Sequence, residues 1–317
     1  MTTVSTSVGR ADAARPTGRG AGDTPPAAAT SVSSRTWVRA LSRDAGILPF
    51  FAYTGIFLLL PTILVIIGAF TARDGGFSLD GIHQALNART AKIFWTTTWL
   101  AAVTAIVGAV VGSVIAYALS TAPQGSVSRR VITAFNSVLA QFGGVMLAFA
   151  FIAMLGTNGM ITRLLHALLN VDVPSNLLSS MSGIVLVYIY FQIPLMVIVF
   201  VPAVDGLRSE WRETTMSFGG TTRTFWLSVA GPILAPRFLG ALLLLFANAF
   251  SAFATAAALI SQQTIIVPMA IESAIRNENN TNMTAYAQVL ALGMILVIAV
   301  IMALYAALQR KTARWEQ

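Results

Sequence analysis

Six long apolar runs decide what this 317-residue chain can fold into. Each is close to the roughly 20 apolar residues that an α-helix needs to cross the hydrocarbon core of a bilayer. Hydrophobic residues make up 56% of the chain and charged residues 10%, whereas a soluble domain has about 25% charged residues. We therefore predict an all-α, polytopic membrane protein with six transmembrane helices, at residues 47–70, 95–119, 131–155, 183–204, 238–260 and 285–308.

The basic residues gather in alternate connections. The N-terminal tail, residues 120–130, residues 205–237 and the C-terminal tail hold 15 of the 20 Lys and Arg residues. Basic residues are retained on the cytoplasmic side, so both termini and the 205–237 connection are predicted to be cytoplasmic, and the protein to be a multi-pass protein of the plasma (cytoplasmic) membrane. The net charge of +8 is explained by this topology, and we predict no nucleic-acid partner.

Composition divides the chain into three parts. Residues 1–44 are rich in Ala, Thr, Ser, Gly and Pro and cannot bury a core, so we predict a disordered cytoplasmic N-terminal tail. Residues 45–309 form the six-helix transmembrane domain, and residues 310–317 a cytoplasmic C-terminal tail.

No catalytic or metal site is predicted. The chain has no cysteine, and its two histidines, His83 and His166, lie in outer loops without H-x-x-x-H spacing. Lys92 and Lys311 are the only lysines, and neither ends the Gly-x-x-x-x-Gly-Lys loop that holds phosphate. The chain therefore has no ATPase site of its own and no predicted cofactor.

The polar residues well inside the six runs are uncharged. Ion-coupled transporters commonly place ionisable residues inside the bilayer, and none lies well inside these runs. Neutral polar groups either form hydrogen bonds between helices or line a wet pathway, and both interpretations stay open for each residue alone. Asn248, Ser251 and Thr255 of the fifth run are spaced at i, i+3 and i+7, so they form one stripe on a helix, and this favours a cavity beside them. The candidate translocation residues are Asn248, Ser251, Thr255, Gln141 and Gln192.

The polar interval 207–236, between the fourth and fifth runs, has the sequence features of a docking loop. The i, i+4, i+7 spacing of Trp211, Thr215 and Phe218 predicts a short helix at 209–218, which Gly219 and Gly220 end. Thr221 or Thr222 is then expected to cap a second short helix. Two prolines, Pro232 and Pro236, are expected to mark the exit of this second helix.

This interval resembles the cytoplasmic signature of permease subunits of ATP-binding-cassette (ABC) importers, E-A-A-x-x-x-G followed nine residues later by I-x-L-P. Here it reads Glu213-Thr214-Thr215, Gly219, then Val229-Ala230-Gly231-Pro232, with the spacing kept. The Ala116-Tyr117-Ala118-Leu119 and Leu155-Gly156-Thr157-Asn158-Gly159 segments and Pro194 also resemble the shared permease module. The resemblance implies a type I importer fold and an ATPase-coupling helix, with Glu213, Gly219, Trp211, Phe218, Thr214, Thr215 and Pro232 as the coupling residues.

The resemblance also implies the partners. A permease of this kind works with two ABC ATPase subunits that bind the ATP, a second permease subunit, identical or different, an extracytoplasmic solute-binding protein and membrane lipid. The outline is similar to permeases for polyamines, phosphonates, ferric iron or thiamine, so a small polar solute is expected. The alternatives are a sugar-class ABC permease, a secondary transporter, and a membrane scaffold whose loop only docks a partner.

Overall fold

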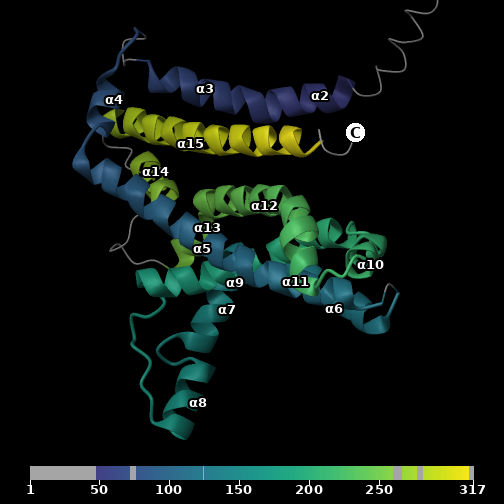
Figure 1. The fold of residues 1–317 in the computed structure, drawn as a ribbon. Helices are drawn as coiled ribbons and strands as arrows, with labels where there is room; N and C mark the ends of the chain where they lie inside the picture. Colours follow the sequence, from purple (N-terminus) through teal and green to yellow (C-terminus); the bar gives the residue numbers. More distant parts are fainter. Residues whose placement is uncertain (1–47, 72–75, 124, 260–265, 277–280, 314–317) are drawn as a thin grey trace, which may run out of the picture. The chain divides into compact units, whose positions relative to one another are not determined.

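A computed structural model describes residues 48–71, 76–123, 125–259, 266–276 and 281–313 (Figure 1). The predicted tail 1–44 lies outside these residues, as do residues 314–317. The described residues are helices joined by turns, and they contain no strand beyond one isolated bridge between Thr71 and Phe77, so the all-α prediction is confirmed. The chain divides into two compact units, Met1–Phe57 and Leu58–Gln317, which are described separately.

In the first unit, helix α2 (Leu48–Thr54) leads into a π-helical turn, η1 (Gly55–Leu59), where the second unit begins. Within the second unit, α5, α9 and α12 pack against one another, and α15 packs along both α12 and α3 (Figure 1). Its helices are α3 (Leu60–Ala69), α4 (Asp80–Ala85), α5 (Ala88–Thr121), α6 (Val127–Gln141), α7 (Gly144–Leu155), α8 (Met160–Leu169), α9 (Met181–Asp205), α10 (Ser209–Ser217), α11 (Thr222–Phe225), η2 (Trp226–Ala230, π-helical), α12 (Gly231–Ser251), α13 (Ala254–Leu259), α14 (Val267–Arg276) and α15 (Thr281–Ala313).

Six helical stretches among the described residues are long and apolar enough to cross a membrane, which confirms the predicted number. The first, second, fourth and sixth stretches contain or nearly match the runs predicted at those positions. The third and fifth stretches begin and end at other residues than predicted, and the predicted runs are interrupted there. The stretches are Pro49–Ala69, Ala88–Thr121, Gly144–Leu169, Met181–Asp205, Thr222–Ser251 and Met283–Arg310.

The predicted continuous helix at 131–155 is wrong, because the chain breaks between α6 and α7. Gly144 has a φ of 66°, in the left-handed region that interrupts an α-helix. Both pieces still contact α9. The Asn136 amide in α6 donates to the Pro194 carbonyl (3.0 Å), and Phe151 in α7 lies edge-on to Tyr190, at 5.4 Å between ring centroids. By length and composition, the third stretch able to cross a membrane is Gly144–Leu169, which comprises α7 and α8.

The predicted fifth helix at 238–260 is wrong at both ends. It begins earlier, since α11, η2 and α12 form one unbroken helical stretch, and α12 ends at Ser251 before the short α13. Both π-helical turns precede a proline, Pro61 for η1 and Pro232 for η2. Proline has no N–H for the carbonyl four residues back, so a wider turn accommodates it without ending the helix.

Helices α5 and α9 lie in very close contact. Gly108 and Gly112 form a G-x-x-x-G pair, a motif that permits such contact, and they face α9, where Gln192 and Met196 are fully buried. The main buried core lies further along these helices and includes Leu100, Leu147, Ile184, Tyr188 and Phe250. This core therefore lies next to both breaks, the one between α6 and α7 and the one between α12 and α13.

Candidate functional site

Helix α10 confirms the helix predicted at 209–218 and ends at the predicted glycines. Gly219 has a φ of 78°. Its N–H donates to the Met216 carbonyl (3.0 Å), and the N–H of Gly220 donates to the Thr215 carbonyl (2.9 Å), which are the two bonds of a Schellman ending. A Cβ on Gly219 would meet no atom within 4 Å, so the backbone conformation, and not crowding, favours glycine here.

The predicted coupling residues of α10 differ in exposure. Phe218 is 88% exposed, and Glu213 and Thr214 are exposed beside it. Trp211 and Thr215 are half-buried, and the Thr215 hydroxyl donates to the Trp211 carbonyl (2.7 Å). The exposed surface of α10 and its turn therefore offers the Phe218 ring and the carboxylates of Glu210 and Glu213 to a partner.

The second predicted helix of the interval is not a separate element. Thr221 caps it, with a capping box that Thr224 completes, but the helix then runs through η2 into α12. Pro232 and Pro236 therefore lie within a helical stretch and do not mark its exit, which corrects the expectation. Pro232 is exposed on this stretch.

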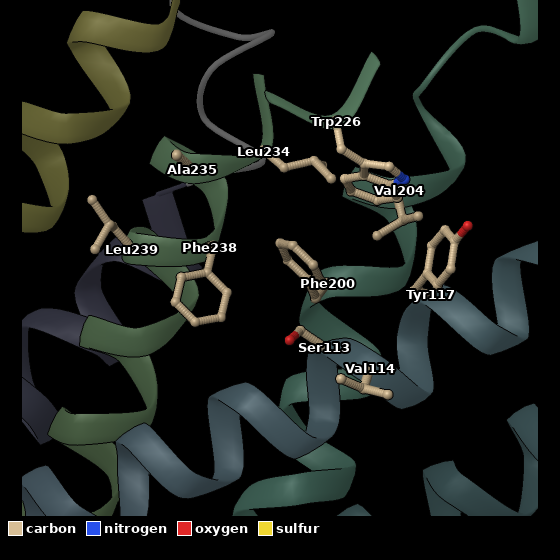
Figure 2. Close-up of a pocket in the computed structure, with 10 residues that line it drawn as sticks. All are labelled: Ser113, Val114, Tyr117, Phe200, Val204, Trp226, Leu234, Ala235, Phe238 and Leu239. Atoms are coloured by element: carbon tan, nitrogen blue, oxygen red, sulfur yellow. The ribbon is translucent and has the colours of Figure 1, made fainter. Parts of the chain in front are cut away.

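An apolar groove of about 540 Å³ lies where this stretch meets α5 and α9 (Figure 2). The Trp226 ring packs edge-on against Tyr117, at 5.1 Å between centroids, and Phe200 packs edge-on against Phe238. The hydroxyl of Ser113 is already used in a bond to the Val110 carbonyl (2.9 Å). The groove therefore offers apolar contact and no charge. Its lining residues are Ser113, Val114, Tyr117, Phe200, Val204, Trp226, Leu234, Ala235, Phe238 and Leu239.

A second candidate region is an uncharged polar cluster between α9 and α12. The fully buried Gln192 donates from Nε2 to the Leu245 carbonyl (2.7 Å), and its Oε1 accepts from Nδ2 of Asn248 (3.3 Å). Asn248 itself is exposed. The pair thus connects a buried amide to an accessible one.

The two breaks in the transmembrane helices meet beside this cluster. The Thr255 hydroxyl donates to the Gly144 carbonyl (3.2 Å), which links α13 to the start of α7. Tyr188 of α9 donates its hydroxyl to the Ala252 carbonyl (2.7 Å) in the gap between α12 and α13. In a bilayer, backbone groups released by a break need partners within the protein, and the Tyr188 hydroxyl supplies one for the Ala252 carbonyl.

The three residues of the predicted stripe, Asn248, Ser251 and Thr255, do not lie on one helix. Asn248 and Ser251 are exposed on α12, but the helix ends before Thr255, which is buried against α7. Gln141 is exposed at the end of α6, and Gln192 is buried. Gln192 is therefore hydrogen-bonded to Asn248, whereas the Thr255 hydroxyl is hydrogen-bonded to the Gly144 carbonyl of α7.

Sequence reasoning missed the role of Tyr188. The Gly143-Gly144 pair was a local signal for the first break, while no glycine or proline marks the gap at Ala252. Nothing in the local sequence therefore indicated that a tyrosine hydroxyl would be needed there. Among the described residues, no group of three or more His, Cys, Asp or Glu side chains could hold a metal ion.

Part of the chain matches a known protein family. Residues 173–314, from just before α9 to the C-terminal end, match the model of the family described as binding-protein-dependent transport system inner membrane component. No curated protein matches the sequence.

Solved structures share the fold at low sequence identity. A bacterial ABC transporter involved in the import of the acidic polysaccharide alginate has a TM-score of 0.70 at 16% identity, covering 89% of this chain and 99% of that one. The bacterial alginate transporter in complex with its alginate pentasaccharide-bound periplasmic protein gives 0.70 at 15%, covering 88% and 98%. The inward-facing MetNI methionine ABC transporter gives 0.52 at 11%, covering 72% and 99%.

These findings agree with the six apolar helices and with the signature spacing in 207–236. They favour a permease over a secondary transporter. Residues 173–314 therefore match the inner membrane components of binding-protein-dependent transport systems, and the fold is that of ABC importer permeases, which together with the six apolar helices indicates a multi-pass inner-membrane protein of this kind.

Proposed function

We propose that the segment 207–236 couples this permease to ABC ATPase subunits through α10 and its glycine turn. The observation that carries the proposal is the exposure of Phe218, 88%, at the end of a short helix that packs mainly against α11. An aromatic side chain so exposed is stabilised when a partner covers it, and aromatic anchors dominate the energetics of such contacts. Glu213 adds a charge-assisted bond to a basic group of the partner.

The remaining partners follow from this assignment. ATP is bound by the ATPase subunits and not by this chain. A second permease subunit, identical or different, completes the translocation path, and an extracytoplasmic binding protein delivers the solute. The 207–236 segment and both termini lie on the cytoplasmic side, as the distribution of basic residues supports.

The solute is proposed to be small and polar, of the polyamine, phosphonate, ferric iron or thiamine classes. The uncharged cluster around Gln192 and Asn248 supports recognition through hydrogen bonds along the path. A saccharide is the alternative, favoured by the resemblance to an alginate importer, although 16% identity carries the fold and not the solute. Stimulation of ATP hydrolysis by spermidine, a phosphonate, ferric citrate, thiamine or an oligosaccharide, each with the binding protein present, separates these classes.

The coupling assignment is tested with two glycine variants in which a side chain introduces similar backbone strain. Gly219 and Gly125 have φ values of 78° and 92°, and neither has an atom within 4 Å of an added Cβ. A valine at either position costs about 1–2 kcal/mol of left-handed strain. We expect Gly219→Val to abolish co-purification of the ATPase and ATP-driven uptake, and Gly125→Val to keep both. Glu213→Ala is expected to weaken docking while the permease still inserts.

Two results would contradict the assignment. If Gly219→Val and Glu213→Ala both retained the ATPase and normal uptake, α10 would not be the coupling element. If Gly125→Val lost the ATPase as completely as Gly219→Val, backbone strain anywhere on the cytoplasmic side would explain the loss.

A further inference from the structure

The C-terminal end of α9 is held by two arginines from different helices. Arg129 of α6 forms an ion pair with the Asp205 carboxylate, and its Nη1 also donates to the Ala122 carbonyl (3.2 Å). Arg237 of α12 donates from Nη1 to the Ala203 carbonyl (3.5 Å). The last turn of α9 is therefore connected to α6 on one side and to α12 on the other.

The Arg129–Asp205 pair is partly shielded from water. The side chains are 14% and 26% exposed, so the pair is screened less than a surface ion pair, and removing one partner leaves the other partly desolvated. Arg130, the next residue, is exposed. Since Arg130 alone meets the need for a cytoplasmic basic residue, topology does not explain why Arg129 is turned towards Asp205.

The two charges are placed against both helix dipoles. Arg129 lies in the first turn of α6, where the positive end of the dipole disfavours a cation, and Asp205 lies in the last turn of α9, where the negative end disfavours an anion. The Arg129–Asp205 pair therefore offsets an unfavourable dipole interaction at each of the two helix ends, so both charges depend on the contact between them.

The same helices lead to the polar cluster. Helix α6 ends at the break before Gly144, and α12 ends at the break before α13, while three residues connect Asp205 to the first residue of α10. The arginine joint, which we define as Arg129, Asp205, Arg237 and the Ala203 carbonyl, thus lies between the proposed docking helix and both broken helices. We propose that Arg129 and Asp205 are positioning residues that transmit movement of α10 to the breaks beside Gln192 and Asn248.

This inference rests on the proposed coupling role of α10, and its test uses the absence of cysteine from the chain. In the complex with its ATPase, Ser251→Cys places a single thiol at the exposed end of α12. The rate of its reaction with a maleimide is compared without nucleotide and with ATP plus vanadate. We expect the nucleotide to change this rate in the otherwise unaltered chain.

Adding Asp205→Asn or Arg129→Gln is expected to leave ATPase association and hydrolysis intact but to abolish the nucleotide-dependent change in labelling. The double exchange, Arg129→Asp with Asp205→Arg, rebuilds the pair with both charges favourable to their helix dipoles, and is expected to restore the change. Glu272→Gln breaks the exposed Glu272–Arg276 pair on α14 and serves as the control that keeps the response.

A response that persists in Asp205→Asn and Arg129→Gln would overturn the inference, as would a double exchange that fails to restore it. Loss of the ATPase from either single variant would also overturn it, because the pair would then belong to docking. If the unaltered chain binds no ATPase and shows no response, the proposed function fails and the inference with it.

Discussion

Replacing Gly112 by alanine tests a very close contact between α5 and α9. A Cβ at Gly112 would lie 2.5 Å from Cβ of Met196 and 2.8 Å from the Ile193 carbonyl oxygen. Carbon atoms in ordinary contact are about 3.5–4.0 Å apart, so α5 and α9 would have to separate by about 1 Å. Neither neighbour gives way easily, because Met196 is fully buried and the oxygen belongs to helix backbone.

The magnitude follows from two opposing effects. Overpacking a close contact costs about 1–3 kcal/mol, whereas exchanging glycine for alanine inside a helix gains up to about 1 kcal/mol in helix propensity. The rigid neighbours place the first effect in the upper part of its range. We therefore expect Gly112→Ala to lower the free energy of unfolding by about 1–2 kcal/mol.

The assay is unfolding of the purified protein in detergent, compared with Gly55→Ala. An added Cβ at Gly55 meets no atom within 4 Å, so this control carries the propensity gain without the clash. Gly112→Ala should unfold at a lower temperature than Gly55→Ala. Equal stability of the two variants would refute the reasoning, since it would mean that α5 and α9 are not packed through this glycine.

Two further predictions concern the polar cluster. Tyr188→Phe removes the hydroxyl that donates to the Ala252 carbonyl and should lower the free energy of unfolding by about 0.6–1.7 kcal/mol, as measured for interhelical hydrogen bonds in membranes. Thermal unfolding is compared with that of Tyr190→Phe, which keeps its ring contact with Phe151, and equal midpoints would contradict the prediction. Gln192→Leu and Asn248→Leu should show a coupling energy of about 0.5–1 kcal/mol in a double-mutant cycle, because they share one hydrogen bond; strictly additive effects on unfolding would show that this bond contributes nothing.

The features that the sequence predicted well are those with local causes. The helix α10 and its ending were predicted from the spacing of Trp211, Thr215 and Phe218 and from Gly219, and the structure has both the helix and the glycine ending. The number of apolar helices also follows from composition along the chain. The coupling and translocation residues themselves stay predictions, since no contact with a partner or a solute tests them.

The wrong predictions concern where a helix is interrupted, which the hydropathy of a run does not show. An apolar run is equally apolar whether or not its helix is broken, so 131–155 was predicted as one helix although α6 ends at Gln141. The prolines gave the opposite error. Pro232 was expected to mark the exit of a helix, but a π-helical turn accommodates it, and the stretch from Thr222 to Ser251 continues.

The break at Ala252 shows why long-range contacts were needed. No local residue requires the helix to stop there, and the carbonyl of Ala252 is bound by Tyr188, 64 positions away in the sequence. Because hydrocarbon offers no hydrogen bonds, such a break is tolerated only where protein or water surrounds it. The Tyr188–Ala252 and Thr255–Gly144 bonds place both breaks near Gln192 and Asn248, where we expect lipid to be excluded. We therefore expect the solute to pass beside the Gln192–Asn248 pair and not along the predicted stripe, since Thr255 is already committed to the Gly144 carbonyl.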